Sequence, residues 1–339
     1  MPTTLEDIAR ALKVSKMTVS RAINNHPEIS SETRARILAV AQKMNYRPNQ
    51  FARALTTNRS YLIGIVVPDL MHSYFSEICR GVESQARSVG YQNLICSTDE
   101  ESRKEMEEIE ALRSRTDGLI VASSLADNEV RFYRQLLKDG ARIVLIDRLL
   151  SGLKCSSVIT DDVEVGRLAT EHLIKLGHKQ IGHLRGTTAS TSLDRYKGYV
   201  LALEGAGLQL HSNIVKECGF TEADGAAATK RWINDGSLPS AIFAANDPAA
   251  IGAMSALHDA GIRVPEDVAI VGAGSIHYGD MLRVPLTTVA WSTMEMGQAA
   301  AKLLLESIEE KSKPANRQVI VKPELVIRQS CGAKRRRTE

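Results

Sequence analysis

Residues 14–25, VSKMTVSRAINN, combine cations, hydroxyls and amides with only a few apolar side chains. The apolar residues Val19, Ala22 and Ile23 recur at helical spacing, which predicts a helix over about 16–24 with a narrow buried face. The side chains on its other face are long or polar, and they are Lys16, Met17, Ser20 and Arg21. A helix with so little apolar surface needs neighbouring helices, and it leaves its second face free to contact a partner.

The preceding segment also predicts a helix. Thr4 stands before an apolar pattern at helical spacing over about 5–12, so it is a candidate N-cap, and Asp7 completes a capping box. After a tight turn, Ser15 is the candidate cap of the second helix. Two short helices joined in this way are typical of a helix-turn-helix.

A third helix follows, and its cap is either Ser30 or Ser31. Its apolar face is formed by Ile37, Val40, Ala41 and Met44. The three helices predict a DNA-binding helix-turn-helix domain over residues 1–47. In the major groove, Lys or Arg of the second helix can pair with guanine, and Met17 can contact a thymine methyl. The alternative is a solvated surface helix with a charged face.

The charge of the chain is divided unevenly along its length. The 339 residues carry a net charge of +3, but residues 1–60 hold ten Lys and Arg against four Asp and Glu, a local charge of +6 that leaves −3 for the rest. A basic N-terminal region on a slightly acidic body indicates a polyanion bound at that region only. The hydrophobic content of 43% is typical of a soluble protein with two or three domains.

Several classes of protein are disfavoured. No apolar run reaches the roughly 18 residues of a membrane span, and the start, MPTTLEDIAR, has acids where a signal peptide would be basic. We therefore expect a cytoplasmic protein without a membrane partner. The five cysteines form no CxxC pair and have no histidine at metal spacing, which predicts buried thiols, no metal and no cofactor. No phosphate loop, HExxH or nucleophile elbow is present, so we expect no enzyme.

Residues 45–60, NYRPNQFARALTTNRS, follow the third helix. Asn49 after Pro48 is a candidate cap for a helix of about eight residues, a length that is marginal by itself in water. Such a helix needs DNA or a second copy of the chain to stay folded, and Leu55 is placed to act as a wedge between base steps of a minor groove. We assign residues 48–59 to a hinge helix and linker, with a plain flexible linker as the alternative.

The segment TLEDIARALKVSKMTVSRAINN, followed by NYRPNQFARAL, resembles the head and hinge of the LacI/GalR family of bacterial transcription regulators. The resemblance implies phosphate contacts from Ser15 and Thr18, base contacts from Lys16, Met17 and Arg21, and hinge contacts from Asn49, Ala52 and Leu55. It also implies that Asn24 supports a backbone contact. With Thr4 and Ser20, these residues form the predicted DNA-binding set. The Lys-Met pair is similar to that of gluconate-type repressors in the family.

The rest of the chain, residues 60–330, alternates strand-like runs with helical stretches. The first series is YLIGIVVP, YQNLICS, GLIVASS and ARIVLID, and the second is SSVITDD, QIGHLRG, IVKECGF, AIFAAND and VAIVGAG. Near-continuous apolar strands separated by helices predict parallel sheets covered on both faces. We therefore expect an α/β fold in which an all-α headpiece precedes two doubly wound lobes, with a ligand off the carboxyl ends of the strands.

Residues near these strand ends are the candidates for an effector site. Aromatic rings can stack on a ring-shaped metabolite, and an Arg fork with nearby amides or carboxylates can hold its polar groups. The predicted effector-binding set is Tyr74, Phe75, Asp147, Arg148, Arg195, Asn246, Asp247, Ser275 and Trp291. Any one of them could instead be a helix cap or a surface pair, but their joint placement at successive strand ends favours a site.

Three further segments, LIKLGHKQIGHL, AANDPAAIGA and VPLTTVAWSTMEMGQAAAKLL, are similar to a two-lobed, periplasmic-binding-protein-like effector domain. The resemblance implies three crossings between the lobes. It places 61–159 and 289–317 in the first lobe, and 160–288 and 318–328 in the second, followed by a basic tail at 331–339. Such lobes hinge as rigid bodies, so a ligand in the cleft can change their relative angle.

One departure from the family concerns the ligand. The family usually shows Gly-aromatic-Asp-Asp after the last strand of the second lobe, whereas this chain has GAGS at 272–275. The carboxylate that commonly grips sugar hydroxyls is therefore missing. Without an acid beside Arg148, Arg195 and His277, the pocket is predicted to be relatively positive and to favour an anion such as a sugar acid over a neutral hexose.

These features together predict a ligand-responsive transcriptional regulator. One helix-turn-helix reads few bases, so we expect a homodimer on a pseudo-palindromic double-stranded DNA operator. No heptad of leucines follows Arg328, which favours a dimer over a tetramer. The resemblance implies a repressor released by a small sugar or sugar acid, and a corepressor that tightens DNA binding is the open alternative. A transport-type sugar-binding protein would share the lobes but not the basic head.

Overall fold

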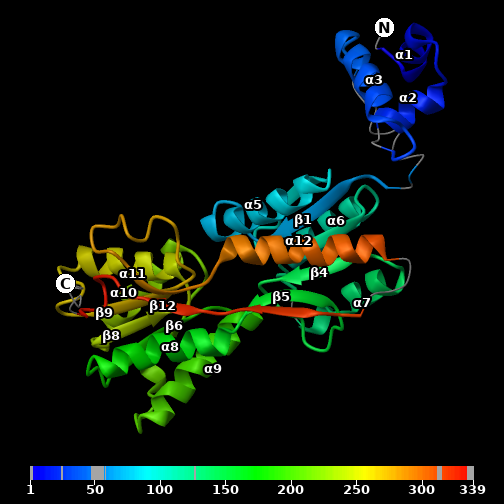
Figure 1. Ribbon diagram of the computed structural model, residues 1–339. Coiled ribbons are helices and arrows are strands. Elements are labelled where there is room, and N and C mark those ends of the chain that lie inside the picture. Colours follow the sequence, from blue (N-terminus) through cyan, green and yellow to red (C-terminus); the bar gives the residue numbers. More distant parts are fainter. Residues whose placement is uncertain are drawn as a thin grey trace. The chain divides into compact units, whose positions relative to one another are not determined.

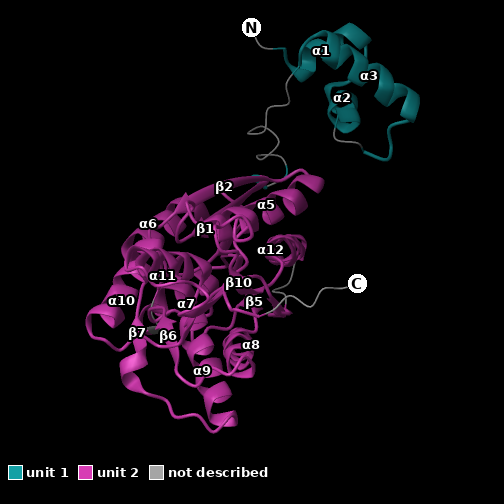
Figure 2. Cartoon of the chain, turned by 90° about the vertical axis from the view of Figure 1, so that its left-hand side faces the viewer, with its two compact units in different colours: residues 1–60 teal, residues 61–339 magenta. Residues whose placement is uncertain are grey.

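The computed structural model describes residues 3–23, 26–46, 57, 59–125, 127–310 and 315–333. The chain divides into two compact units, residues 1–60 and residues 61–339, which we call the headpiece and the body (Figure 2). The predicted hinge contacts Asn49, Ala52 and Leu55, together with Asn24 and residues 334–337 of the tail, lie outside the described residues.

The headpiece contains three helices among its described residues: α1 (Leu5–Leu12), α2 (Lys16–Ile23) and α3 (Ser31–Lys43). The predicted caps are confirmed. Thr4 and Asp7 form the capping box of α1, and Ser30 is the N-cap of α3. Ser15 Oγ accepts the backbone N–H of Thr18 at 3.0 Å and so caps the start of α2.

The core of the headpiece is small. Its buried side chains are Ile8, Ala9, Val19, Ala22, Ile37 and Ala41. The narrow buried face predicted for α2 is confirmed, because that helix buries only Val19 and Ala22. Lys13 adopts a left-handed backbone with φ 54°, which ends α1 and closes the tight turn before α2.

The body contains two sheets (Figure 1). In the first sheet the strand order is β11-β5-β4-β3-β1-β2, and all neighbouring pairs are parallel. The strands are β1 (Leu62–Val67), β2 (Gln92–Ser97), β3 (Gly118–Val121), β4 (Ile143–Ile146), β5 (Ser156–Thr160) and β11 (Gln318–Val321). Its helices are α5 (Ser73–Ser88), α6 (Ser102–Arg113), α7 (Arg131–Lys138) and α12 (Thr293–Glu309), with a 3₁₀ turn η1 (Asp127–Glu129). Helices α5 and α12 cover one face of this sheet, and α6 and α7 cover the other.

The second sheet has the strand order β12-β10-β9-β8-β6-β7, and only β12 is antiparallel to its neighbour among the described strands. The strands are β6 (Ile181–Arg185), β7 (Val215–Glu217), β8 (Ala241–Ala244), β9 (Ala269–Ala273), β10 (Thr287–Ala290) and β12 (Glu324–Val326). Its helices are α8 (Asp162–Lys175), α9 (Ser190–Gly205), α10 (Glu222–Asn234) and α11 (Asp247–Asp259), with a 3₁₀ turn η2 (Ser212–Ile214). Helices α8 and α9 cover one face, and α10 and α11 cover the other, so the predicted doubly wound α/β class is confirmed.

The lobe boundaries differ from the prediction in two places. Strand β11 pairs with β5 in the first sheet, although residues 318–328 were predicted to lie in the second lobe. Strand β10 continues to Ala290 in the second sheet, two residues past the predicted boundary. The SSVITDD strand β5 was grouped with the second series of strands but belongs to the first sheet, in agreement with the predicted boundary at residue 159. The run QVIVKPELVIR contains two strands because Pro323, which has no N–H for a ladder, separates β11 from β12.

The chain crosses between the lobes three times, over very short segments. Asp161 separates β5 from α8, and Trp291 and Ser292 separate β10 from α12. Lys322 and Pro323 separate β11 from β12. Within the part of the chain that the structure describes, no helix is both long and apolar enough to cross a bilayer.

Two glycines bring α8 and α9 unusually close together. A Cβ atom built on Gly166 would collide with the backbone carbonyl of Arg195, and one built on Gly198 would collide with that of Val163. Both positions therefore require glycine for steric reasons. The contact holds the backbone of Arg195 against α8, which also carries Asp162.

Candidate DNA-reading face and effector pocket

The side chains predicted to read bases lie on the exposed face of α2. Met17 is 62% exposed, and Lys16 and Arg21 are exposed as well. Ser15 and Thr18 share a hydrogen bond of 2.8 Å at the start of the helix. Ser20 is half-buried, and the predicted contact residue Thr4 is engaged in the cap of α1.

Both cations of this face already have carboxylate partners in the headpiece. Lys16 Nζ lies 3.1 Å from Glu6 Oε1 in the first turn of α1. Arg21 Nη1 lies 2.6 Å from Glu28 Oε2 in the segment between α2 and α3. Because all four side chains are exposed, water competes for these ion pairs and their cations can change partners easily.

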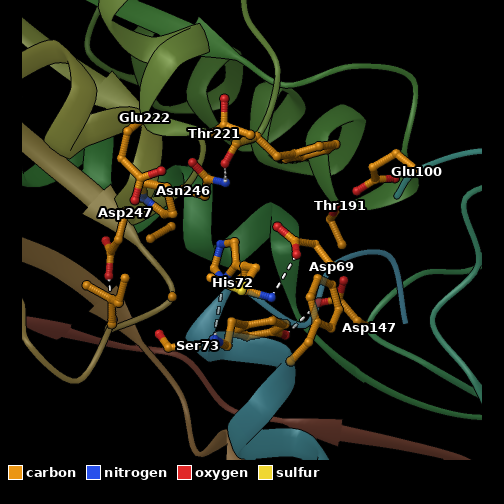
Figure 3. Close-up of a pocket in the computed structure, with 18 of the residues that line it drawn as sticks. Asp69, His72, Ser73, Glu100, Asp147, Thr191, Thr221, Glu222, Asn246 and Asp247 are labelled. Carbon is orange, nitrogen blue, oxygen red and sulfur yellow. Dashed lines mark hydrogen bonds between the residues drawn. The ribbon is translucent and has the colours of Figure 1, made fainter. Parts of the chain in front are cut away.

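A pocket in the body lies where the predicted strand-end residues meet (Figure 3). Eight of the nine residues of the predicted effector set line it: Tyr74, Phe75, Asp147, Arg148, Arg195, Asn246, Asp247 and Trp291. They come from α5 and the end of β4 in the first lobe, from α9 and the start of α11 in the second, and from one crossing between the lobes. The expectation that a ligand binds off the carboxyl ends of the strands therefore selected residues that are far apart in the sequence but line the same pocket.

Two predicted neighbours of the pocket lie elsewhere. Ser275 does not line the pocket, whereas the adjacent Gly274 and Ile276 do. Ser275 has a left-handed backbone with φ 54°, and its N–H donates to Thr288 Oγ1 at 3.4 Å. His277 is also outside, with its side chain 62% exposed and Nδ1 3.6 Å from Glu77 Oε1. The sequence could not show this because no local pattern indicates the left-handed backbone at Ser275.

Tyr74 connects three elements at the first-lobe side of the pocket. Its hydroxyl donates to Asp147 Oδ1 at 2.5 Å and accepts the indole N–H of Trp291 at 3.2 Å. Burial and the neighbouring Asp147 carboxylate raise the pKa of Tyr74 well above its usual value, so the phenol stays protonated. Asp147 has a left-handed backbone with φ 66°, a strained conformation that functional sites often retain.

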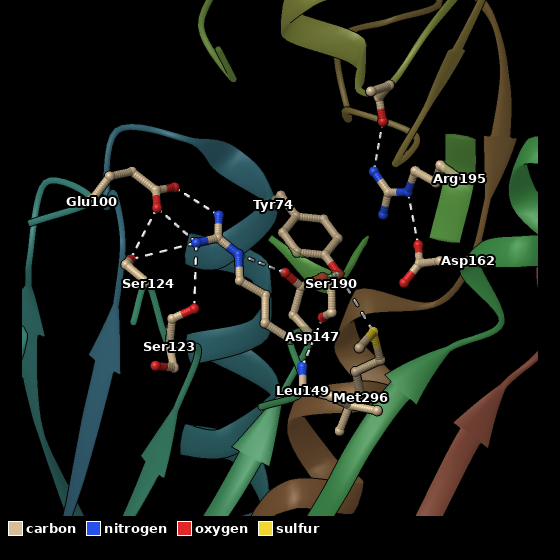
Figure 4. A network of polar contacts seen from close by, with 12 residues as sticks. Tyr74, Glu100, Ser123, Ser124, Asp147, Leu149, Asp162, Ser190, Arg195 and Met296 are labelled. Atoms are coloured by element: carbon tan, nitrogen blue, oxygen red, sulfur yellow. Dashed lines mark hydrogen bonds and ion pairs between the residues drawn. The ribbon is translucent and has the colours of Figure 1, made fainter. Parts of the chain in front are cut away.

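Arg148 is buried and pairs with carboxylates, although its Nε, which lies 3.7 Å from Asp147 Oδ2, has no hydrogen-bond partner in the described part of the chain (Figure 4). Its guanidinium binds the Glu100 carboxylate in a bidentate pair, with N–O distances of 2.6 and 2.7 Å. Glu100 also accepts a hydrogen bond of 2.9 Å from Ser124 Oγ. The other side of the guanidinium lies 5.0 Å from the ring centroid of Phe220, in the second lobe. This cation therefore links the two lobes rather than standing free in the pocket.

Arg195 is buried in the same way. Its Nε donates to Asp162 Oδ1 at 2.7 Å, its Nη1 donates to the carbonyl of Ala245 at 2.6 Å, and its guanidinium lies 5.1 Å from the ring centroid of Trp291. Burial raises the pKa of Asp162 to about 7, although the Arg195 charge acts in the opposite direction. The pair is therefore sensitive to the removal of either partner.

Asn246 and Asp247 hold the backbone of the second lobe. Asn246 caps α11 by accepting the N–H of Ala249, and its amide donates to the carbonyl of Phe220 at 2.8 Å. Asp247 accepts the N–H of Ile276 and the hydroxyl of Thr288, both at 2.7 Å, and burial raises its pKa. These two residues fix the loops that carry other pocket residues.

Several lining residues were not part of the predicted effector-binding set. They are Asp69, His72, Glu100, Thr191, Phe220 and Glu222, together with neighbours of the predicted set. Asp69, Glu100 and Glu222 follow β1, β2 and β7, so their positions after strands also indicate a place near the pocket. His72 caps α5, and burial lowers its pKa, which keeps the imidazole neutral.

The prediction of a relatively positive pocket is wrong. Among the described residues that line it are five carboxylates and two guanidinium groups. Neither Glu222 nor Asp69 forms an ion pair within the described part of the chain, whereas both arginines do. The missing acid at 272–275 is therefore outweighed by acids from other strand ends. Within the described residues, no group of three or more His, Cys, Asp or Glu side chains could hold a metal ion.

Comparison with known proteins agrees with both parts of the molecule. Residues 4–49 match the lacI family of bacterial regulatory proteins, and residues 170–331 match a periplasmic binding protein-like domain. The transcriptional regulator DegA of Bacillus subtilis is 34% identical, covering 97% of this chain and 98% of its own length. The ribose operon repressor of Halalkalibacterium halodurans is also 34% identical and covers 97% of each chain.

The solved structures give the same result. The Lac repressor dimer bound to operator and the anti-inducer ONPF is 28% identical, with a TM-score of 0.85 over 98% of this chain and 100% of that one. The likeness thus includes the head and both lobes. From these matches, the chain belongs to the LacI family of bacterial transcriptional regulators, which bind DNA and are not enzymes.

Proposed function

We propose that this chain represses transcription as a homodimer on a pseudo-palindromic operator, and that a small neutral sugar bound in the body lowers its operator affinity. In the headpiece, Lys16, Met17 and Arg21 read bases, while Ser15 and Thr18 contact phosphates. Operator DNA lies in the cytoplasm, so the protein acts there.

The charge of the pocket is the observation that supports a neutral ligand. Arg148 and Arg195 are already paired with Glu100 and Asp162, so neither offers a free guanidinium to an anion. An anionic ligand would instead lie beside the carboxylates that line the pocket, which repel it. Sugar hydroxyls can donate to carboxylates, and aromatic rings can pack against the carbon side of a sugar ring.

The relatives support the same class of ligand. One of them is named a ribose operon repressor, and the transcriptional regulator CelR was solved in complex with cellobiose. Both are similar to this chain along the headpiece and the body. The proposal therefore combines the pocket of the body with the DNA contacts of the headpiece.

A thermal-shift experiment with matched pairs of ligands tests the ligand class. The full-length protein is heated with ribose or ribonate, glucose or gluconate, and galactose or galactonate. A ligand that binds only the native state raises Tm. We expect a neutral sugar to raise Tm and its acid to have no effect. Stabilisation confined to the acids would overturn the neutral-ligand proposal and leave the DNA-binding assignment intact.

A pair of variants makes this test specific to the pocket. Glu222→Gln should reduce the stabilisation by the neutral sugar, because the amide replaces a carboxylate that can accept hydroxyl protons and that has no ion-pair partner among the described residues. Glu204→Gln changes the same charge on the exposed surface of α9 and should have no effect. Equal loss of stabilisation in both variants would place the binding site elsewhere.

The direction of the response is tested with an operator. The full-length protein selects its preferred sequences from a library of random duplexes, and the affinity for the selected duplex is then measured with and without the sugar. We expect the sugar to weaken binding. Tighter binding in its presence would identify a corepressor instead.

A further inference from the structure

Two carboxylates of the headpiece form ion pairs with the two cations that are proposed to read bases. Glu6 reaches Lys16 from a position ten residues earlier, and Glu28 reaches Arg21 from a position seven residues later. The two acids come from different elements, the first turn of α1 and the segment before α3. Both cations of α2 are thus paired in the headpiece without DNA, although they are the cations proposed to enter the groove.

The ion pairs are too exposed to serve mainly as structural contacts. The Lys16 and Glu6 side chains are 60% and 65% exposed, and the Arg21 and Glu28 side chains are 44% and 61% exposed. Exposed pairs of this kind stabilise a fold little, because water and salt compete with them. Their carboxylates are nevertheless close enough to act on whatever approaches the two cations.

A carboxylate beside a base-reading cation affects random and operator DNA differently. On random DNA, the cation gains only contacts with phosphates, and the carboxylate both competes for the cation and repels the phosphates. On the operator, a guanine edge offers Arg21 two acceptors in a fixed geometry, which compensates for the lost partner. The same acid therefore weakens random binding more than operator binding.

We propose that Glu6 and Glu28 are specificity-determining residues that set the ratio of operator to random DNA affinity by competing for Lys16 and Arg21. The inference rests on the proposed base-reading roles of these two cations. Neither acid needs to contact DNA. Each acts by holding its cation away from phosphates until a matching base edge replaces it.

The test uses the full-length protein, a labelled random-sequence duplex and an operator selected by the wild-type protein. Fluorescence anisotropy gives both affinities over a range of salt concentrations for Glu6→Gln, Glu28→Gln and the double variant. Glu32→Gln is the matched control. Glu32 is an exposed acid in the first turn of α3, as Glu6 is in α1, and it forms no ion pair among the described residues.

We expect each of the first two substitutions to tighten random-duplex binding by about two- to fivefold, with operator affinity changed by less than about twofold. The slope of the logarithm of random-duplex affinity against the logarithm of salt concentration should also become steeper. The change should correspond to about one additional phosphate contact per headpiece, because a cation has been freed. Glu32→Gln should change neither the random-duplex affinity nor its salt dependence in this way. Circular dichroism of each variant confirms that the helices are retained.

Three outcomes would overturn the inference. Glu6→Gln and Glu28→Gln could behave like Glu32→Gln, which would show a general effect of net charge. Operator and random affinities could rise equally, which would leave the ratio unchanged. A wild-type protein that selects no sequence would remove the proposed function as well, and this result is distinguishable from the first two because it appears before any variant is made.

Discussion

The headpiece and the body contain the same kind of contact in opposite surroundings. The side chains of Arg21 and Glu28 in the headpiece are 44% and 61% exposed, whereas those of Arg195 and Asp162 in the body are 7% exposed each. An exposed pair exchanges partners with water and ions, but a buried pair cannot lose one partner without leaving the other charge unsolvated. The cations of the headpiece are therefore available to a ligand, whereas the arginines of the pocket keep their carboxylate partners and form part of its structure.

Breaking a buried pair should have the largest effect. Arg195→Ala leaves Asp162 buried without its cation, and we expect the free energy of unfolding of the body to fall by about 3–5 kcal/mol. Both tryptophans of the chain, Trp232 and Trp291, lie in the body, so tryptophan fluorescence during urea unfolding reports this unit alone. The double variant with Asp162→Ala should lose less than the single one. A loss below about 1 kcal/mol in Arg195→Ala would contradict the assignment of a buried, interdependent pair.

Removing an exposed cation should act on binding and not on folding. Arg21→Ala should weaken operator binding by about 1–3 kcal/mol per headpiece, because one bidentate base contact is lost. The unfolding of the body, followed by tryptophan fluorescence, should not change. Unaltered affinity for the selected operator would remove Arg21 from the base-reading set.

A buried imidazole offers a pH test of the same contrast. His183 is fully buried between aromatic rings, and burial lowers its pKa to about 3. The unfolded chain takes up a proton near the usual pKa of 6.5, while the folded chain does so only near pH 3. The contribution of His183 to stability is therefore complete above pH 6.5 and is lost as the pH falls, by at most about 1.4 kcal/mol per pH unit.

The variant His183→Phe isolates this contribution. Between pH 6.5 and pH 4.5, we expect the slope of its unfolding free energy against pH to be smaller than that of the wild type. The difference should be about 1.4 kcal/mol per pH unit, the value for one bound proton. The variant also loses the 2.9 Å contact between His183 Nδ1 and the carbonyl of Phe243, which lowers stability at every pH. Parallel pH profiles for the two proteins would show that the imidazole is accessible to protons in the folded state.

The smallest effect is expected for the stability of the headpiece itself. Glu6→Gln removes the exposed pair with Lys16, and the free energy of opening of the headpiece should change by less than about 1 kcal/mol. Hydrogen exchange of the α1 and α2 amides in the full-length protein measures this quantity. A larger loss would mean that the pair is needed for folding, and the contrast with the body would then be weaker.

The three described helices of the headpiece could be predicted almost residue by residue because their signals are local. Thr4, Ser15 and Ser30 each cap a helix that begins at the next residue, and the apolar spacing sets the buried face. The lining of the pocket was also predicted well, since the carboxyl ends of parallel strands meet at one edge. Its charge was not, because Arg148 and Glu100 are 48 positions apart and Arg195 and Asp162 are 33 apart. No local pattern indicates which acid faces which cation.

The three short crossings between the lobes have a consequence for how a ligand acts. Trp291 lies on one of these crossings and also lines the pocket, beside Arg195 of the second lobe and Tyr74 of the first. The family resemblance predicts that the lobes rotate as rigid bodies, and a ligand that contacts this indole would lie close to the axis of a rotation about these crossings. In a rigid rotation each atom moves in proportion to its distance from the axis, so a small shift at Trp291 accompanies a much larger displacement of the outer helices. For such a rotation, the pocket would lie where the least movement at the ligand produces the most movement at the periphery of the body.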